Sequence, residues 1–381
     1  MLLRIMVIVL AVALSLAGCG EPRAGSLPPV AESGAEALYS APGLDDGDAA
    51  PWERAEGTAA PRSVGLDSTL LAAAYDRASE LPRLRSLLVA RQGELLGERY
   101  YRGATADRPA NVKSVSKSVI SALVGIAIAE GHLGGLDQPI ADFFPGQLGS
   151  DADPRKREIT IEHLVSMRGG LESTSFANYG QWVSSRNWVQ NALARPMVAD
   201  PGTRMIYSTG STHLLSAILT RSTGMSTLEY AHRRFAEPLG IRMRPWPTDP
   251  QGIYFGGNDM LFTPREMVRI GELYLNGGRF GGRQIVPEEW VRESFQVLAR
   301  SPWNNHGYGY GWWSRQAGRY PVHFAWGYGG QYIFIVPELE LVVVTTSDAS
   351  ATTRDGGHLS ALHDLVDRYL VPAAVRGAEA R

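Results

Sequence analysis

A serine and a lysine stand three positions apart at the start of a long apolar stretch. Ser114 and Lys117 open residues 114–130, which are apolar nearly throughout. This composition predicts a buried helix, and residues i and i+3 lie on the same face of a helix. The amine of Lys117 can therefore reach the hydroxyl of Ser114. A neutral amine in that place would take the serine proton while the oxygen attacks a carbonyl carbon.

Lysine is rare in this chain, which adds weight to Lys117. The chain has 37 lysines and arginines, of which only Lys113, Lys117 and Lys156 are lysines. Arginine is never neutral in a protein, whereas a buried lysine loses its charge readily. Ser114 also stands at a predicted helix N-terminus, where unpaired amides favour negative charge. The structural alternative is that Ser114 only caps the helix, as serine often does.

Several segments, taken in order, resemble the serine β-lactamase-related family. They are Ser114–Ser118, Leu136–Pro145, Ile159–Met167, Pro201–Thr209, Phe262–Met267 and Gly282–Trp290. The family includes class C β-lactamases and D-alanyl carboxypeptidases. This chain is closest in appearance to two other members, the family VIII esterases and the aminohexanoate-dimer hydrolases. The resemblance covers about residues 64–372 and implies that Ser114 is the nucleophile and Lys117 its base partner.

The second motif of the family is Tyr-x-Asn, and it brings a tyrosine to the serine–lysine pair. Tyr207-Ser208-Thr209 matches the tyrosine and has threonine in place of asparagine. The resemblance implies that the phenol of Tyr207 relays protons between the serine, the lysine and the leaving group. Thr209 is then expected in the substrate pocket. The alternative for Tyr207 is a core aromatic residue.

The third motif of the family lies on a strand and supplies a backbone amide. The corresponding segment is Ala325–Gln331, which includes Trp326, Gly327, Tyr328 and Gly330. The resemblance implies that one amide here joins that of Ser114 in an oxyanion hole. Glycine suits such a place because the substrate must approach the backbone closely. We expect Gly327 to be the motif glycine and the Tyr328 amide the donor, with Gly330 as the alternative.

The substrate predicted by these residues is an ester or a small amide, cleaved through an acyl-enzyme. The third motif lacks the lysine that would bind a lactam carboxylate, and Thr209 lacks a side-chain amide. Trp182 is a candidate pocket residue, together with other aromatic residues: Tyr179, Trp188, Trp303 and Trp313. One alternative is a D-alanyl carboxypeptidase or weak β-lactamase acting on cell-wall peptides or lactams. Another is a non-catalytic binding or sensor lipoprotein.

Other classes of hydrolase and of partner find no support in the sequence. It contains no Gly-x-Ser-x-Gly and no His-Glu-x-x-His motif, and it has one cysteine. These absences disfavour an α/β-hydrolase and a zinc enzyme, so we expect no metal and no cofactor. The formal net charge of −2 gives no reason to expect nucleic acid as a partner.

The elements that must position these residues follow from the apolar pattern. Strand-like runs occur at residues 85–91 and 95–101, and again at 331–337 and 341–346, whereas the middle of the chain is helical. Strands near both ends of the domain predict one antiparallel sheet completed by both termini. A helix over residues 358–370 would pack on it. We therefore expect an α+β, β-lactamase/transpeptidase-like fold, in which helices flank the sheet and a mostly helical lobe leaves the active site in a cleft between them.

The first 63 residues are predicted to hold the domain at a membrane. Residues 1–18 have one arginine and an apolar stretch too short to span a bilayer, which is typical of a secretory signal. Leu16–Cys19 resembles a bacterial lipobox, in which Cys19 carries the lipid. Residues 19–63 are rich in Ala, Pro and Gly and predict a flexible tether. The hydrolase domain is expected at 64–372, a short tail at 373–381, and the protein in the bacterial cell envelope, on the periplasmic face or the outer membrane.

Overall fold

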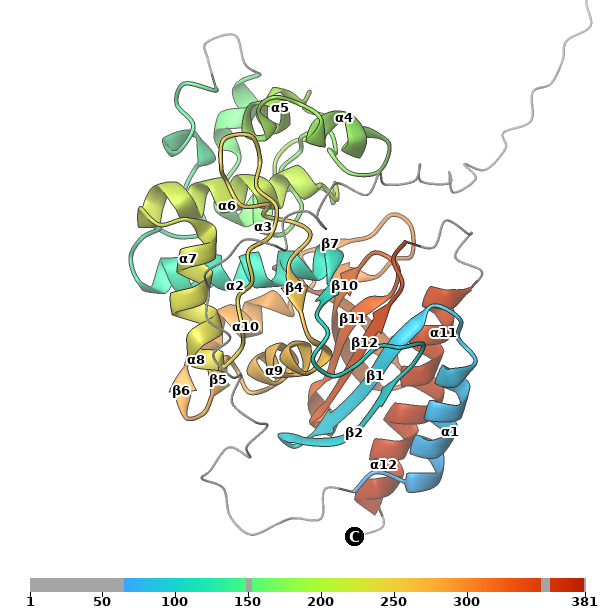
Figure 1. Cartoon of the computed structure of the whole chain (residues 1–381). Helices are drawn as coiled ribbons and strands as arrows, with labels where there is room; N and C mark the ends of the chain where they lie inside the picture. Colours follow the sequence, from blue (N-terminus) through green and yellow to red (C-terminus); the bar gives the residue numbers. More distant parts are fainter. Residues whose placement is uncertain (1–64, 149–152, 351–356, 380–381) are drawn as a thin grey trace, which may run out of the picture.

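The computed structural model describes residues 65–148, 153–350 and 357–379. The predicted signal peptide, the tether and the lipidation site Cys19 lie outside these residues. The described chain forms a large sheet with helices on both faces and a mostly helical lobe beside it (Figure 1). The predicted α+β fold is therefore confirmed.

The sheet has eight strands in the order β2-β1-β12-β11-β10-β9-β8-β7. Its strands are β1 (Leu84–Arg91), β2 (Glu94–Tyr100), β7 (Ala299–Arg300), β8 (Gly307–Tyr308), β9 (Trp313–Ala317), β10 (Tyr320–Gly327), β11 (Gln331–Val336) and β12 (Leu341–Ser347). Each neighbouring pair is antiparallel, and β1 from the start of the domain pairs with β12 from its end. The prediction that both termini complete the sheet is confirmed.

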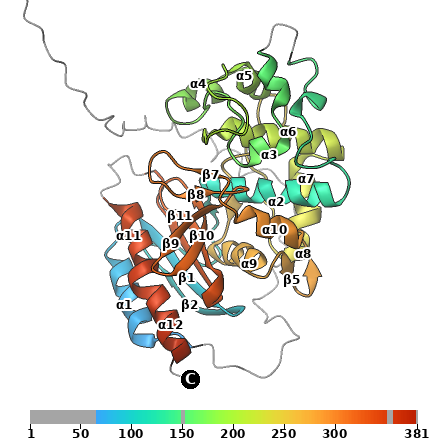
Figure 2. The same ribbon diagram turned by 180° about the vertical axis from the view of Figure 1, so that it is seen from behind.

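Helices cover both faces of this sheet (Figures 1 and 2). On one face, α1 (Ser68–Ser79) packs beside α11 (His358–Leu365) and α12 (Val371–Glu379). On the other face, α9 (Pro264–Leu275) packs against β11 and β12. Because both faces are covered, every residue of β11 and β12 is buried, and their apolar runs are continuous rather than alternating.

The last helix extends further than the sequence indicated. The predicted end of the domain at residue 372 falls inside α12, which continues through most of the predicted tail. Two contacts hold it: the backbone amide of Asp67 donates to the carbonyl of Ala373 at 3.0 Å, and the buried guanidinium of Arg91 donates to the carbonyl of Ala374 at 2.9 Å. Residues 373–379 therefore belong to the folded domain.

The helical lobe sits at one end of the sheet (Figure 1). Its helices are α3 (Ile161–Val165), α4 (Tyr179–Val183), α5 (Trp188–Ala194), α6 (Thr209–Thr223), α7 (Thr227–Ala231) and α8 (Glu237–Leu239), and α10 (Glu288–Ser294) lies closer to the sheet. Between lobe and sheet runs α2 (Ser116–Ala129), whose first twelve residues are buried. The predicted buried helix is thus the element that joins the two parts.

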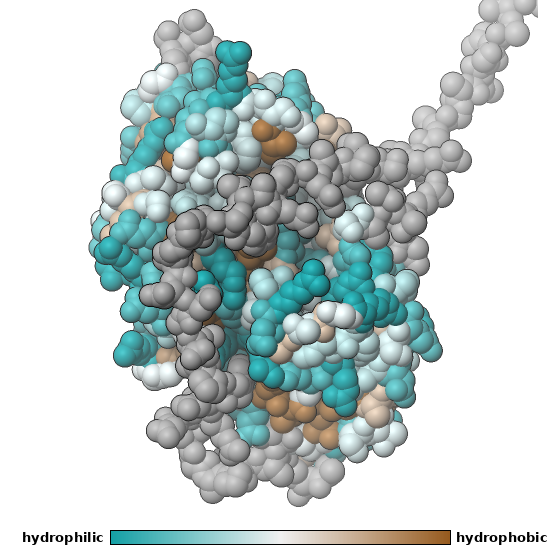
Figure 3. Space-filling model, viewed as in Figure 1, coloured by the Kyte–Doolittle hydropathy of each residue, from teal (hydrophilic) through white to brown (hydrophobic). Residues whose placement is uncertain are grey.

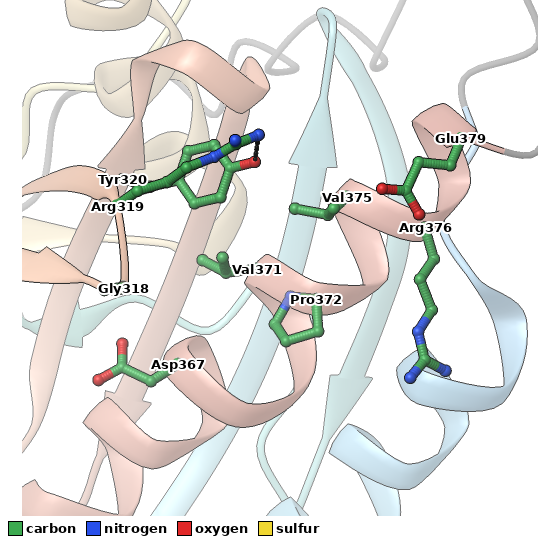
Figure 4. Close-up of a pocket in the computed structure, with 10 residues that line it drawn as sticks. Gly318, Arg319, Tyr320, Asp367, Val371, Pro372, Val375, Arg376 and Glu379 are labelled. Carbon is green, nitrogen blue, oxygen red and sulfur yellow. Dashed lines mark hydrogen bonds between the residues drawn. The ribbon is translucent and has the colours of Figure 1, made fainter.

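The face shown in Figure 3 is largely hydrophilic, with small separate apolar patches. A shallow groove between the β9–β10 turn and α12 is lined by Arg319, Tyr320, Val371 and Val375 (Figure 4), and Arg319 donates to the Tyr320 hydroxyl at 2.8 Å. It includes none of the predicted site residues. In the described part of the chain, no helix is long and apolar enough to cross a membrane.

Candidate active site

Ser114 lies in a tight turn that leads directly into α2. The 3₁₀ turn Lys113–Val115 precedes the helix. The hydroxyl of Ser116, the first residue of α2, donates to the carbonyl of Lys113 at 2.7 Å. Lys113 has a φ of 51°, a left-handed conformation that is uncommon outside glycine. The turn leaves Ser114 partly exposed while Lys117, one turn further on, is 2% exposed. A reachable hydroxyl thus stands above a buried amine.

The amine of Lys117 has three polar neighbours. Its Nζ lies 3.0 Å from Ser114 Oγ, 3.3 Å from Thr209 Oγ1 and 2.6 Å from the carbonyl oxygen of Gly257. A neutral amine has two N–H donors and one lone pair. The carbonyl of Gly257 and the hydroxyl of Thr209 can accept the two donors, so the lone pair remains for the Ser114 hydroxyl. The arrangement orients the lysine as a base toward the serine.

Burial also sets the charge of this lysine. Removal from water lowers the pKa of Lys117 to about 7, and the carboxylate of Asp259 partly opposes this effect. Desolvation disfavours the charged form of an amine. A base with a pKa near neutrality is neutral in a large fraction of molecules and still accepts a proton well. The buried position therefore gives Lys117 the properties that general base catalysis requires.

Thr209 belongs to the hydrogen-bond network of the lysine. Its Oγ1 lies 2.8 Å from Ser175 Oγ, and its backbone amide donates to the same Ser175 oxygen at 2.8 Å. Both side chains are buried. The threonine that departs from the Tyr-x-Asn motif thus fixes the amine of Lys117 from one side. Its contacts place it beneath the nucleophile, as a partner of the base.

Tyr207 lies just before Ser208, the N-cap residue of α6. Its side chain reaches the Ser114–Lys117 pair. Its ring lies 5.2 Å from Lys117 Nζ, and its hydroxyl interacts with the Ser114 side chain. Burial raises the pKa of Tyr207 to about 12, and the hydrogen bond to Ser114 partly offsets that effect. The phenol is therefore protonated at neutral pH and suited to give a proton rather than to take the first one.

Aromatic rings surround Tyr207. Trp313 stacks on it at 5.7 Å between ring centroids, and Tyr308 packs edge-on at 6.4 Å. Phe176 and Trp303 lie at 6.2 Å and 6.5 Å. Trp313 and Tyr308 are almost fully buried. These rings exclude water from one side of the phenol, which is the cause of its raised pKa.

One part of the site has no counterpart among the predicted residues. The loop at 256–260 supplies the Gly257 carbonyl, and a Cβ on Gly257 would lie 2.4 Å from Thr212 Oγ1 and 3.1 Å from Lys117 Nζ. Asp259, at a φ of 67°, accepts from Asn111 at 2.8 Å and pairs with Lys113 at 3.1 Å. The adjacent glycines at 256 and 257 are the signal in the sequence that could have indicated a close approach of backbone.

The third motif lies at the end of β10, next to the nucleophile turn. A Cβ on Gly327 would lie 2.1 Å from the carbonyl oxygen of Val112, two residues before Ser114. Only glycine allows the strand to approach so closely. Trp326 precedes it and packs edge-on against Trp313 at 5.7 Å. Tyr328 follows it, with its side chain 44% exposed. Gly327 therefore has the position expected of the motif glycine, with the Tyr328 amide next along the chain.

Gly330, the alternative, faces another part of the molecule. A Cβ there would meet Leu362 and His358 of α11 and the hydroxyl of Ser347, at 2.7 to 3.0 Å. These residues belong to the interface between the sheet and the C-terminal helices. The Gly330 amide donates to the carbonyl of Gly327 at 3.2 Å across the tight turn after β10, so it is already engaged within that turn. Its predicted role in the oxyanion strand is not supported.

Trp182 is not a pocket residue. Its side chain is fully buried, and its Nε1 donates to the carbonyl of Trp188 at 3.0 Å. It packs edge-on against His213 and Phe255 in the core of the lobe. The prediction of a substrate contact at Trp182 is wrong, because a side chain with no exposed surface cannot touch a ligand. Trp303, by contrast, is 58% exposed and lies beside Tyr207.

Within the described residues, no group of three or more His, Cys, Asp or Glu side chains could hold a metal ion. A partly exposed hydroxyl, a buried amine and a protonated phenol converge on one point beside the end of a strand.

Comparison with known proteins agrees with this geometry. The sequence model of the beta-lactamase family matches residues 85–368. A 6-aminohexanoate-dimer hydrolase of Paenarthrobacter ureafaciens is 25% identical over 283 residues, covering 69% of this chain and 72% of that protein. Two of the solved structures that are similar in fold come from this kind of protein or from a related hydrolase.

The first of these structures, from Bacillus anthracis and proposed to be a 6-aminohexanoate-dimer hydrolase, has a TM-score of 0.67 at 21% identity, covering 81% of this chain and 82% of the other. EstCE1, described as a hydrolase with promiscuous acyltransferase activity, has a TM-score of 0.67 at 19% identity over 79% of this chain and 99% of the other. The family match spans most of the domain and includes every residue that converges on Ser114. The chain therefore belongs to the beta-lactamase family of serine hydrolases.

Proposed function

We propose that the protein cleaves an ester or a small amide through a covalent acyl-enzyme on Ser114. The observation that carries this proposal is the buried Nζ of Lys117, 3.0 Å from a partly exposed Ser114 Oγ, with both other amine contacts already made to Thr209 and Gly257. A preorganised base beside an accessible hydroxyl is the arrangement that nucleophilic catalysis requires.

The proposed reaction has two stages. In the first, Ser114 Oγ attacks the carbonyl carbon while its proton passes to Lys117, and the amides of Ser114 and Tyr328 stabilise the oxyanion. The bond to the leaving group then breaks as the Tyr207 hydroxyl gives it a proton, and Lys117 returns a proton to Tyr207. In the second stage, water attacks the acyl carbon and gives a proton to Lys117. The bond between that carbon and Ser114 Oγ then breaks, the proton returns to Ser114 Oγ, and the carboxylic acid leaves.

The preference for esters or small amides rests on the residues around the pair. The third motif, Ala325-Trp326-Gly327, has no cationic side chain of the kind that would bind a lactam carboxylate. The curated relative is named for the hydrolysis of an amide, the 6-aminohexanoate dimer. We therefore propose that the scissile group is an ester or a small amide.

Acylation of Ser114 tests the proposal directly. p-Nitrophenyl acetate should release a burst of p-nitrophenol equal to the enzyme concentration, and the intact mass should rise by one acetyl group on Ser114. Ser114→Ala should show neither. Ser118→Ala is the matched control, because Ser118 lies on the same helix and donates to the carbonyl of Gly311 at 2.7 Å, away from Lys117. No burst from the wild type, or an equal burst from Ser114→Ala, would refute the proposal.

We also propose that the protein is held in the bacterial cell envelope by a lipid on Cys19. The support is the apolar leader followed by Leu16–Cys19 and by the polar stretch to residue 63. Such an anchor would keep the hydrolase domain beside a membrane without threading the chain through it.

A further inference from the structure

Two exposed aromatic side chains from different parts of the fold meet beside Tyr207. Phe176 is 43% exposed and Trp303 is 58% exposed, although both are large and apolar. Their ring centroids are 5.1 Å apart at 68°, an edge-to-face contact. Phe176 belongs to the helical lobe, in the turn Phe176–Asn178 before α4. Trp303 lies in the loop between β7 and β8 of the sheet. The pair thus links the two parts of the domain at the surface.

Local hydrogen bonds hold the backbone segments that carry both rings. Phe176 follows Ser175, whose oxygen is fixed by Thr209, and the turn after it is held by Asn178, which donates to the carbonyl of Ser173 at 2.8 Å. The backbone amide of Trp303 donates to Ser301 Oγ at 3.2 Å. Phe176 also has a φ of 55°, and a non-glycine residue in that region is strained, as is common at functional sites.

The two rings continue an aromatic surface that begins in the core. Tyr308 and Trp313 pack on the buried side of Tyr207, and Phe176 and Trp303 pack on it from the exposed side. The half-buried side chain of Tyr207 therefore lies next to a wall of apolar rings. A polar or charged group placed there would lose hydration without gaining a partner from the rings. An apolar or aromatic group would bury surface on both sides.

We propose that Phe176 and Trp303 bind the leaving group of the substrate, and that this leaving group is an apolar, preferably aromatic, alcohol or amine. The inference rests on the proposed function, in which Tyr207 gives its proton to the leaving oxygen or nitrogen as the bond to the carbonyl carbon breaks. Whatever receives that proton must lie against the rings that flank the phenol. The acyl group, bonded to Ser114, lies on the other side of the breaking bond.

Esters that share one acyl group separate this effect from the rest of the reaction. Benzyl acetate and 2-methoxyethyl acetate give the same acetyl-enzyme and release alcohols of similar acidity, one aromatic and one polar. The wild type should favour benzyl acetate in kcat/KM. Trp303→Ser and Phe176→Ser should each reduce that ratio about tenfold, the scale of losing one well-placed aromatic contact. Trp303→Phe, which keeps a ring, should retain most of the preference.

A second pair of esters tests whether Phe176 and Trp303 contact the leaving group or the acyl group. Methyl phenylacetate and methyl methoxyacetate share the leaving group and differ in the acyl group, and their ratio should be the same in Trp303→Ser as in the wild type. Val198→Ser, which also changes an exposed apolar residue (42%), should alter neither ratio. An unchanged benzyl preference in both serine variants would overturn the inference, as would an effect confined to the acyl pair. Both outcomes leave acetylation of Ser114 intact, whereas failure of the proposed function abolishes it.

Discussion

Lys117 is suited to its proposed role because burial disfavours the charged form of its amine. The side chain is 2% exposed, and the carboxylate that acts on its charge, that of Asp259, is engaged by Lys113 and Asn111. The result is a pKa lowered to about 7. An arginine in the same place would stay charged. A lysine at this position, in a chain with only three lysines, is explained by the need for an amine that can be neutral.

The first prediction concerns pH. Because the neutral amine of Lys117 is the base, kcat/KM for p-nitrophenyl acetate should rise with pH and level off, with a midpoint near the pKa of about 7. Lys117→Arg should lower kcat by about 10³-fold, within the usual range for loss of a general base. Lys113→Arg, which preserves the ion pair with Asp259, is the control. A pH profile with no midpoint within about one pKa unit of that value would count against Lys117 as the base.

A second prediction at this scale concerns Thr209. Thr209→Val removes the hydroxyl that lies 3.3 Å from Lys117 Nζ and 2.8 Å from Ser175 Oγ while keeping the shape of the side chain. The loss of a buried hydrogen-bond partner costs about 1–1.5 kcal/mol, so kcat/KM should fall about tenfold. Thr209→Ser should keep most of the activity. Equal rates for Thr209→Val and the wild type would show that the threonine does not hold the base.

At the scale of elements, local and distant contacts differ in how well the sequence predicted them. The spacing of Ser114 and Lys117 predicted their contact because both residues lie in one helical turn. The predicted strands 85–91 and 341–346 correspond to β1 and β12, because their apolar runs are continuous. The contacts of Lys117 with Thr209 and Gly257 span 92 and 140 positions, and no local pattern encodes such pairings.

The site residues that the sequence predicted wrongly, or did not predict, also depend on tertiary contacts. Aromatic composition made Trp182 and Trp303 equivalent pocket candidates, whereas tertiary packing buries one completely and exposes the other. Two glycines in one motif left Gly327 and Gly330 as alternatives, and only the turn after β10 distinguishes them. Phe176 escaped notice because the loop before α4 has no periodic pattern.

The helix α9 provides a prediction about stability. Glu272 on this helix is 4% exposed, and one of its oxygens is buried without a hydrogen-bond partner. Burial raises its pKa to about 7, partly offset by Arg269. A carboxyl with a raised pKa contributes stability that is complete below about pH 4.5, its value in the unfolded chain, and that is lost as the pH rises through 7.

Glu272→Gln should therefore remove this loss of folding stability at high pH. The shift from the model-peptide value corresponds to about 3 kcal/mol, so the variant should be more stable than the wild type at pH 8 and similar to it at pH 4.5. Urea unfolding at the two pH values measures the difference. Glu289→Gln, an exposed change on α10, should leave the pH dependence as it is. A variant with the wild-type pH dependence would mean that Glu272 is already ionised in the fold at low cost.

For the whole molecule, the proposed anchor predicts where the enzyme is found. Expressed with its leader in a bacterial host, the protein should carry an alkyne-palmitate label and sediment with membranes. Cys19→Ala should lose the label and leave the membrane fraction. Ser114→Ala, which abolishes acylation, should still be labelled and sediment. If Cys19→Ala remained in the membrane fraction, the lipid anchor would be refuted, with no consequence for the chemistry of the domain.

The pairing of β1 with β12 places the two ends of the folded domain in contact. The amide of Asp67 donates to the carbonyl of Ala373 at 3.0 Å, and Arg91 joins the carbonyls of Gly65 and Ala374. Because its two ends meet, the chain of the domain could be joined there and opened elsewhere without loss of these contacts. A circular permutant would link residue 379 to residue 65 through a short glycine-rich connector. It would begin at Gly282, in the exposed turn between β5 (Arg279–Phe280) and β6 (Arg283–Gln284). This permutant should fold and still become acetylated on Ser114. Loss of folding in that permutant would show that the chain needs its natural starting point to assemble the sheet.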